Sequence, residues 1–220
     1  MVMSRPETED KPEPRWQAVL ALVAVGGIYM ALPPALTVGP RWLLLLVISI
    51  LLVPTIVSHR MGHHSLNHFL GIVINSIITA TLAGSLGLLV AALPGRKEEP
   101  RALLISAAML WSTNVVVFAL WYWRLDGGGP TARLRHRGPG SRAFLFPQMQ
   151  IERTERAALG AEDWSPSFVD YLFVAFNISA AFSPTDTPVL ERWAKLLNMI
   201  QGLISLMIIA LLVSRAVGVL

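Results

Sequence analysis

A cluster of histidines is the part of this chain best suited to metal or proton chemistry. On a continuous helix they would form two pairs four residues apart, His59 with His63 and His64 with His68. Imidazoles at that spacing bind zinc, copper or nickel, and they titrate between about pH 5 and 8. No Asp or Glu lies nearby to complete a usual ligand set, and Gly62 interrupts the helix. The alternatives are therefore a metal site, a pH sensor, or an interfacial loop whose imidazoles meet lipid headgroups.

A second cluster is basic, because Arg133, Arg135 and Arg137 alternate along a segment rich in Gly and Pro. Such a group attracts phosphates, and in a membrane protein these include anionic lipid headgroups. The other interpretation is a solvated, lipid-facing stretch without a specific ligand. The glycines at 127–129 do not form a phosphate-binding loop, because no Lys followed by Ser or Thr comes after them. They are typical of a flexible hinge.

Catalytic chemistry finds little support elsewhere in the sequence. The chain has no Cys, which removes disulfides, thiolate catalysis and thiolate metal sites. Paired carboxylates and the common hydrolase and nucleotide-binding motifs are missing as well. Hydrophobic residues make up 54% of the chain and charged residues 15%, whereas soluble domains carry about 25% charged residues. We therefore expect a membrane protein that is not an enzyme, needs no cofactor and binds no nucleic acid.

Five apolar segments approach the length needed to cross a bilayer. They cover residues 16–32, 42–57, 66–93, 102–123 and 196–220. The second is the weakest, because Pro54 interrupts it. Residues 1–15 mix acidic and basic charge with several prolines and are expected to form a disordered tail. The expected fold class is all-α integral membrane, with five transmembrane helices plus one re-entrant pore-type half-helix.

The half-helix is predicted because the apolar run at 168–182 is too short to span. Its about 15 residues reach roughly 22 Å, against roughly 30 Å for the hydrocarbon core. A polar turn and a full-length span follow, which is the order of a re-entrant unit. Backbone in such a turn must be satisfied by protein or water, so residues 181–186 are expected to be enclosed by neighbouring chains or to line water. This favours an oligomer around an axis.

The C-terminal region resembles the pore helix, filter and inner helix of two-helix potassium channels. Phe168, Asp170, Phe173 and Phe176 stand at pore-helix positions, and residues 192–216 match the inner helix. The region is also similar to a group of small bacterial membrane proteins that carry an F-T-I-G-M-T-F-Q-x-S-D-like string. This chain has F-N-I-S-A-A-F-S-P-T-D at residues 176–186, and the similarity extends upstream through residues 121–123, 127–129 and 144–147.

The resemblance covers about half of the chain and implies a domain organisation. Residues 16–101 would form a three-helix membrane region, and residues 102–220 a pore module. The module would comprise an outer helix at 102–123, an Arg/Gly/Pro-rich cap or loop at 124–166, a re-entrant helix at 167–182, a filter-position turn at 183–187 and an inner helix at 190–219. The resemblance also implies a homotetramer in the bacterial inner membrane.

The chain departs from a potassium filter at the position that sets selectivity. Glycines in a T-V-G-Y-G run let rings of carbonyls replace the water around the ion, but the corresponding run here has no glycine. We therefore expect no potassium selectivity, and a constriction made by side chains. Either Phe182 acts as an apolar gate, or polar side chains form a ring, or the turn only terminates the half-helix. The candidate residues are Ser179, Ala180, Ala181, Phe182, Ser183, Pro184, Thr185 and Asp186.

The inner helix carries a polar stripe that continues into an apolar one. Its members recur at helical spacing and are Asn198, Gln201, Gly202 and Ser205, followed by Ile209 and Leu212. One interpretation is that the stripe lines a pore whose apolar end gates by dewetting. The other is that the small residues allow close packing while the amides bond across helices. Asp170 has two interpretations as well: attraction of cations near the pore, or capping of the half-helix.

The charge distribution does not settle the orientation in the membrane. With five spans, one side carries thirteen of the 18 Lys and Arg residues, at 5, 11, 15, 60, 124, 133, 135, 137, 142, 153, 156, 192 and 195. The positive-inside rule makes that side cytoplasmic. Potassium channels, by contrast, have the loop before the pore helix outside. The rule and the resemblance therefore disagree.

Passive conduction of ions, cations above all, through an oligomeric pore is the expected function. The expected partners are the lipid bilayer, inorganic ions and further copies of the chain. The first alternative is a non-conducting membrane sensor or scaffold of the same fold. The second is a small-solute transporter.

Overall fold

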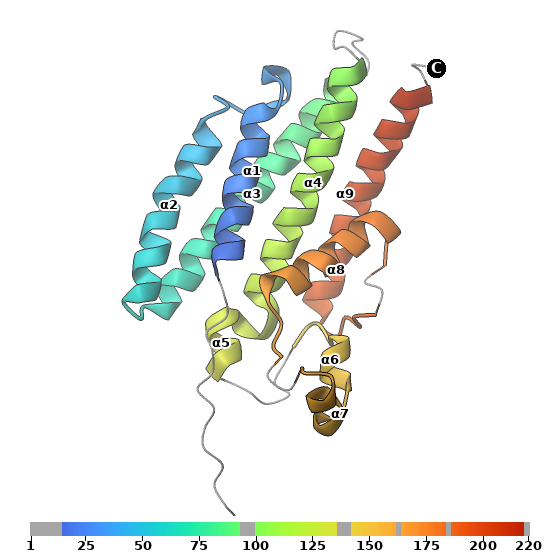
Figure 1. Cartoon of the computed structure of the whole chain (residues 1–220). Helices are drawn as coiled ribbons and strands as arrows, with labels where there is room; N and C mark the ends of the chain where they lie inside the picture. Colours follow the sequence, from blue (N-terminus) through green and yellow to red (C-terminus); the bar gives the residue numbers. More distant parts are fainter. Residues whose placement is uncertain (1–14, 93–99, 136–141, 162–163, 184–185, 218–220) are drawn as a thin grey trace, which may run out of the picture.

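The structure is a computed structural model that describes residues 15–92, 100–135, 142–161, 164–183 and 186–217 (Figure 1). In these ranges the regular elements are helices, and the one β-type pairing is an isolated bridge between Phe144 and Val189. The helices are α1 (Trp16–Ala31), η1 (Pro34–Leu36), α2 (Leu43–Arg60), α3 (His64–Ala92), α4 (Pro100–Leu125), η2 (Asp126–Gly128), α5 (Pro130–Arg135), α6 (Pro147–Gln150), α7 (Arg153–Ala158), α8 (Phe168–Ala181) and α9 (Arg192–Val217).

Four helices, α2, α3, α4 and α9, are long and apolar enough to cross a membrane. This confirms an all-helical, multi-pass membrane protein. The other two apolar helices are shorter, with 16 residues in α1 and 14 in α8. At 1.5 Å per residue α1 measures roughly 24 Å, somewhat less than the hydrocarbon core. A count of five spans plus a re-entrant helix therefore depends on how α1 and α8 sit in the bilayer.

Helices α1, α2, α3, α4 and α9 run alongside one another, and α8 crosses obliquely over α4 and α9 (Figure 1). Helix α4 is central, because it packs against α1, α3, α8 and α9. At one end of the bundle α1 begins, α2 turns into α3, α4 ends and α9 begins; we call it the cap end. The segment between η2 and the start of α8 lies at that end, so the half-length helix starts from the same end as α9.

Two local features of the first helices follow from single residues. Helix α2 continues through Pro54, so the predicted interruption is absent from the backbone. The turn between α2 and α3 forms at Gly62, which has a φ of +74°. That left-handed conformation is readily available only to glycine. His59 therefore lies on α2, His64 and His68 lie on α3, and His63 lies in the turn between the two helices.

An aromatic cluster packs the segment between η2 and α8, which we call the cap, against the helix bundle. The rings of Phe144 and Phe146 are buried, and the centroid of Phe144 lies 5.0 Å from that of Tyr122 on α4. On the other side Phe146 meets Tyr171 of α8 edge-on at 5.3 Å. Edge-to-face contacts of this kind add to the gain from burial. Phe144 and Phe146 therefore hold this part of the 124–166 segment against α4 and α8.

Candidate pore site

Helix α8 begins at a capping box. The carboxylate of Asp170 accepts hydrogen bonds from the backbone N–H of Ser167 at 2.7 Å and from its hydroxyl at 2.8 Å. A negative charge in the first turn also suits the positive end of the helix dipole. Within a single chain, the contacts of Asp170 are therefore those of a helix cap, which is one of its two interpretations.

The far end of α8 lies beside the middle of the long helices. The carbonyl of Ser179 accepts a hydrogen bond from Trp111 Nε1 at 3.4 Å, and its hydroxyl accepts one from Gln201 Nε2 at 2.8 Å. Trp111 is about 14 residues from the end of α4, and Gln201 about nine from the start of α9. At 1.5 Å per residue, the tip of α8 is roughly 14–21 Å from the cap end.

The helix ends at Phe182, which adopts a left-handed conformation with a φ of +54°. Among the described residues it is the only one other than glycine with a positive φ. That conformation costs roughly 1–2 kcal/mol for a residue with a Cβ atom. Its side chain is 52% exposed, so packing within the chain does not offset the strain. Strain of this kind gathers at functional sites.

The chain then returns to the cap end, where it pairs with the cap. The backbone N–H of Leu145 donates to the carbonyl of Pro188 at 3.0 Å. The N–H of Leu190 donates to the carbonyl of Ala143 at 2.8 Å. The carbonyl of Pro188 and the N–H of Leu190 are therefore satisfied inside one chain.

The residues predicted for the constriction fall into two groups. Ser179 is fully buried against α4 and α9, whereas the residues that follow it are exposed: Ala180, Ala181, Phe182, Ser183 and Asp186. Pro184 and Thr185 lie outside the described residues. A surface that an oligomer or water would cover thus begins directly after Ser179.

A buried polar network joins α4, α8 and α9 around Gln201. The hydroxyl of Tyr122 donates to Gln201 Oε1 at 2.6 Å. The amide nitrogen of Gln201 donates to the carbonyl of Ala175 at 2.7 Å as well as to Ser179. Each of these residues has no exposed surface. Because a buried amide left without partners is costly, this geometry fixes α8 at one height on α9.

Asn114 on α4 extends the network along α9. Its Nδ2 donates to Ser205 Oγ at 2.9 Å and to the carbonyl of Gln201 at 3.3 Å. Its Oδ1 is buried and has no partner among the described residues. Gln201 and Ser205 face the interior of their own chain. For these two residues the contacts therefore agree with the packing interpretation of the polar stripe.

The remaining stripe residues are partly exposed. Asn198, Gly202, Ile209 and Leu212 belong to this class. The outermost face of α9 is apolar, and its large exposed side chains are Leu196, Met199, Ile200, Leu203, Leu206, Met207 and Val213. In a bilayer this face suits lipid or a neighbouring helix.

Sequence reasoning missed Asp126. Its carboxylate is fully buried and accepts hydrogen bonds from the N–H of Ala143 and the hydroxyl of Tyr171, both at 2.6 Å. The glycines after it have φ values of 56°, 75° and 91° and form a tight turn rather than a hinge. The one signal was an acidic residue at the start of that glycine run. Asp126 links the end of α4, the cap and the first turn of α8.

The basic and histidine clusters are arranged differently from the sequence prediction. Arg133 is buried, and its Nη1 donates to the carbonyls of Trp123 and Asp126 at 2.7 and 2.8 Å. It therefore lies inside the cap and not on a lipid-facing stretch. Arg137 and the side chain of Arg135 lie outside the described part of the chain.

The predicted pairing of His59 with His63 does not occur, and His59 pairs with His64 instead. His59 faces His64, with ring centroids 6.4 Å apart, because Gly62 ends the helix between them. His63 is exposed, and His68 lies one turn further along α3. The described residues contain no group of three or more His, Cys, Asp or Glu side chains that could hold a metal.

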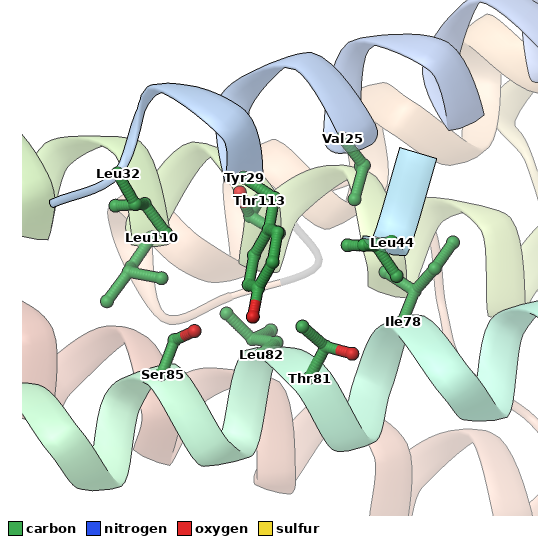
Figure 2. A pocket seen from close by; sticks show the side chains of 10 residues that line it. All are labelled: Val25, Tyr29, Leu32, Leu44, Ile78, Thr81, Leu82, Ser85, Leu110 and Thr113. Carbon is green, nitrogen blue, oxygen red and sulfur yellow. The ribbon is translucent and has the colours of Figure 1, made fainter. Parts of the chain in front are cut away.

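One small cavity lies between α1, α2, α3 and α4 (Figure 2). Its volume is about 10 Å³, which is about enough for one water molecule. The hydroxyl of Ser85 at its wall is buried without a partner among the described residues. This cavity fits a bound water and is too small for a solute.

Comparison with family models, with curated proteins and with solved structures gave no match for this chain.

Proposed function

We propose that this chain is the subunit of an oligomeric pore in the bacterial inner membrane, and that the tip of α8 lines the path of the ion. The observation that carries the proposal is the position of Phe182. A short helix ends beside the middle of two long ones, at a strained and exposed residue. The chain then returns to the end from which it came. This is the order of elements in a pore module, with α4 outside, α8 re-entrant and α9 inside.

The need for several copies follows from the exposure of the tip. At membrane depth, irregular backbone is stable only against protein or water. In one chain Ala181, Phe182 and Ser183 are exposed. Symmetric association of identical subunits would place these tips around a common axis and satisfy both needs. Four copies is the number that the channel resemblance implies.

The network around Gln201 has a supporting role in this proposal. Because Gln201 and Ser205 bond to α4 and α8, their polar groups hold the half-helix in place instead of meeting an ion. The ion would meet Phe182 and the exposed polar residues beyond it, Ser183 and Asp186. A ring of Asp186 carboxylates would favour cations, and a ring of Phe182 side chains would form an apolar gate.

The main alternative is a non-conducting membrane sensor or scaffold of the same architecture. One observation favours it: the side chains of Gln201 and Ser205, two polar residues of the stripe on α9, are bonded inside the chain. In that case the half-helix is a packing element, and the exposed tip contacts a neighbouring copy without enclosing water.

The test is ion flux through the purified protein in liposomes, with potassium, sodium and chloride gradients and empty vesicles as the background. Phe182→Ala should change the flux while leaving assembly intact. The matched control is Phe69→Ala, because Phe69 is also an exposed phenylalanine and lies on α3, away from α8. Asp186→Asn should reduce the preference for cations over chloride. No flux above background under any gradient would contradict the pore and favour the scaffold.

A further inference from the structure

Five cationic or titratable side chains meet at the cap end, where α1 begins, α2 meets α3 and α4 ends. They are Arg15, His59, His64, His68 and Arg124. Arg15 lies close enough to Arg124 and His59, and Arg124 close enough to His68, for their charges to interact. Like charges that lie near one another repel. The grouping therefore needs an explanation.

Arg124 is the central member, and its charge is poorly compensated. Its side chain is 7% exposed, and its Nη1 donates to the carbonyl of Asn67 at 3.3 Å. Among the described residues, its buried Nε has no partner and no Asp or Glu contacts its guanidinium. The carboxylate of Asp126, two residues away, is bonded to Ala143 and Tyr171 instead. A buried guanidinium without a counter-charge is unfavourable, so an anion beside it would be stabilising.

Two glycines shape the surroundings of Arg124. The guanidinium lies against Gly71 of α3, where a Cβ atom would overlap it. Gly129 places its backbone beside the carbonyl of Arg124 and close to His68 Nδ1. The guanidinium thus occupies a position between the helices that is open because Gly71 has no side chain.

Asn67 holds the group together with neutral bonds. Its Oδ1 accepts from Arg15 Nη1 at 3.4 Å, and its Nδ2 donates to the carbonyl of Thr55 at 2.7 Å. The other nitrogen of Arg15, Nη2, donates to Thr131 Oγ1 at 2.7 Å. Both guanidinium groups therefore donate to Asn67, Arg15 to its side chain and Arg124 to its carbonyl.

Exposed apolar and basic side chains surround this group, as in protein segments that lie at the surface of a membrane. Met61, Leu66 and Phe69 are exposed apolar side chains on the turn and the first part of α3, and Arg60 and His63 are exposed beside them. Arg15, His64 and His68 are partly exposed and connect the buried Arg124 with this rim. A mixture of apolar and basic side chains is typical of the headgroup layer.

From this geometry we infer that Arg124, Arg15 and His68 form a binding site for one phosphate group at the headgroup level of the membrane. A phosphate would accept hydrogen bonds from the guanidinium groups and the imidazole, and would supply the negative charge that the guanidinium of Arg124 lacks among the described residues. The phosphate belongs either to an anionic lipid or to a soluble phosphate compound. The site is independent of the proposed pore, because none of its residues lies on α8 or α9.

The experiment measures lipid retained by the full-length protein, purified in a neutral detergent, by native mass spectrometry. The probes are phosphatidylglycerol and phosphatidylcholine with the same acyl chains, and inorganic phosphate is titrated separately by calorimetry. The wild type should retain phosphatidylglycerol in preference to phosphatidylcholine. Arg124→Gln should weaken this binding about tenfold or more, as expected for loss of a charge-assisted bond. Arg101→Gln is the matched control, an exposed arginine at the opposite end of the same helix.

The outcomes separate the two sources of phosphate. Preference for the anionic lipid without binding of inorganic phosphate assigns the site to a headgroup, and binding of inorganic phosphate that Arg124→Gln abolishes assigns it to a soluble compound. Equal retention by Arg124→Gln and Arg101→Gln, with no phosphate binding, overturns the proposal. If Arg124→Gln does not fold, Gly71→Ala takes its place, because it displaces the guanidinium and keeps every charge. Unchanged binding in Gly71→Ala also overturns it.

Discussion

The hydroxyl of Tyr171, in the first turn of α8, donates a 2.6 Å hydrogen bond to the carboxylate of Asp126, just beyond the end of α4. Both side chains are fully buried, and they are 45 residues apart in the chain. The other carboxylate oxygen accepts from the N–H of Ala143. Asp126 therefore holds the first turn of α8 and the backbone of Ala143 next to the end of α4.

Tyr171→Phe should destabilise the protein by about 1–3 kcal/mol, because it leaves one buried oxygen of Asp126 without that donor. The measurement is the free energy of unfolding in detergent. Asp126→Asn and the double variant complete a double-mutant cycle. If the effects of the two changes simply add, the residues do not interact and the contact has no energetic weight.

Gln201→Leu should loosen α8 from α9, since the hydroxyls of Tyr122 and Ser179 lose their partner in a buried site. The chain has no Cys, so one introduced at Ala180 reports alone on the tip of α8. Its reaction with a water-soluble thiol reagent should become faster in Gln201→Leu. Asn198→Leu, on the same helix but only partly buried, is the control. Equal labelling rates in both would show that the network does not hold the half-helix.

Phe182→Gly should leave stability unchanged or raise it by about 1 kcal/mol, because glycine adopts the left-handed conformation without the Cβ penalty. Phe182→Val should lower it, since a β-branched side chain tolerates that conformation least. Thermal unfolding of both variants gives the comparison. A loss of stability in Phe182→Gly larger than in Phe182→Val would mean that the aromatic ring, and not the backbone, determines the energy at the tip.

Single-cysteine labelling from the two sides of sealed vesicles should show that α1 crosses the membrane. Trp16, at the start of α1, and His63, between α2 and α3, lie at the cap end, whereas Val38 lies between α1 and α2 at the other end. Cysteines at positions 16 and 63 should react from the same side, and a cysteine at 38 from the opposite side. The positive-inside rule puts positions 16 and 63 in the cytoplasm. Reaction of all three from one side would contradict both the crossing of α1 and the count of five spans.

Much of the helical plan could be predicted from the sequence, because apolar length is a property of a contiguous segment. Each of the five predicted spans corresponds to a helix, with bounds that differ by a few residues. The segment at 168–182 is a short helix because it starts at a capping pair and ends before a proline. Pro54 was misleading, because one proline removes a single hydrogen bond and the packed helix α2 tolerates it.

The contacts of the site could not be predicted, because they join residues distant in the chain. The spacing of Gln201 and Ser205 indicated a shared face and left open which neighbour that face meets. The structure turns it toward Asn114 and Tyr122 of α4. Asp126 was missed for the same reason, since its partners lie 17 and 45 residues further along the chain.

The half-helix is fastened on three sides, by Asp126 at its first turn, by Gln201 along its flank and by the Ala143–Leu190 pairing on the return segment. None of these fastenings uses the side chains at positions 180–182. Substitutions at those positions thus do not disturb the contacts that hold the frame. A chain with other side chains at positions 180–182 would keep all three contacts. The scaffold can therefore stay the same while the residues that an ion would encounter change.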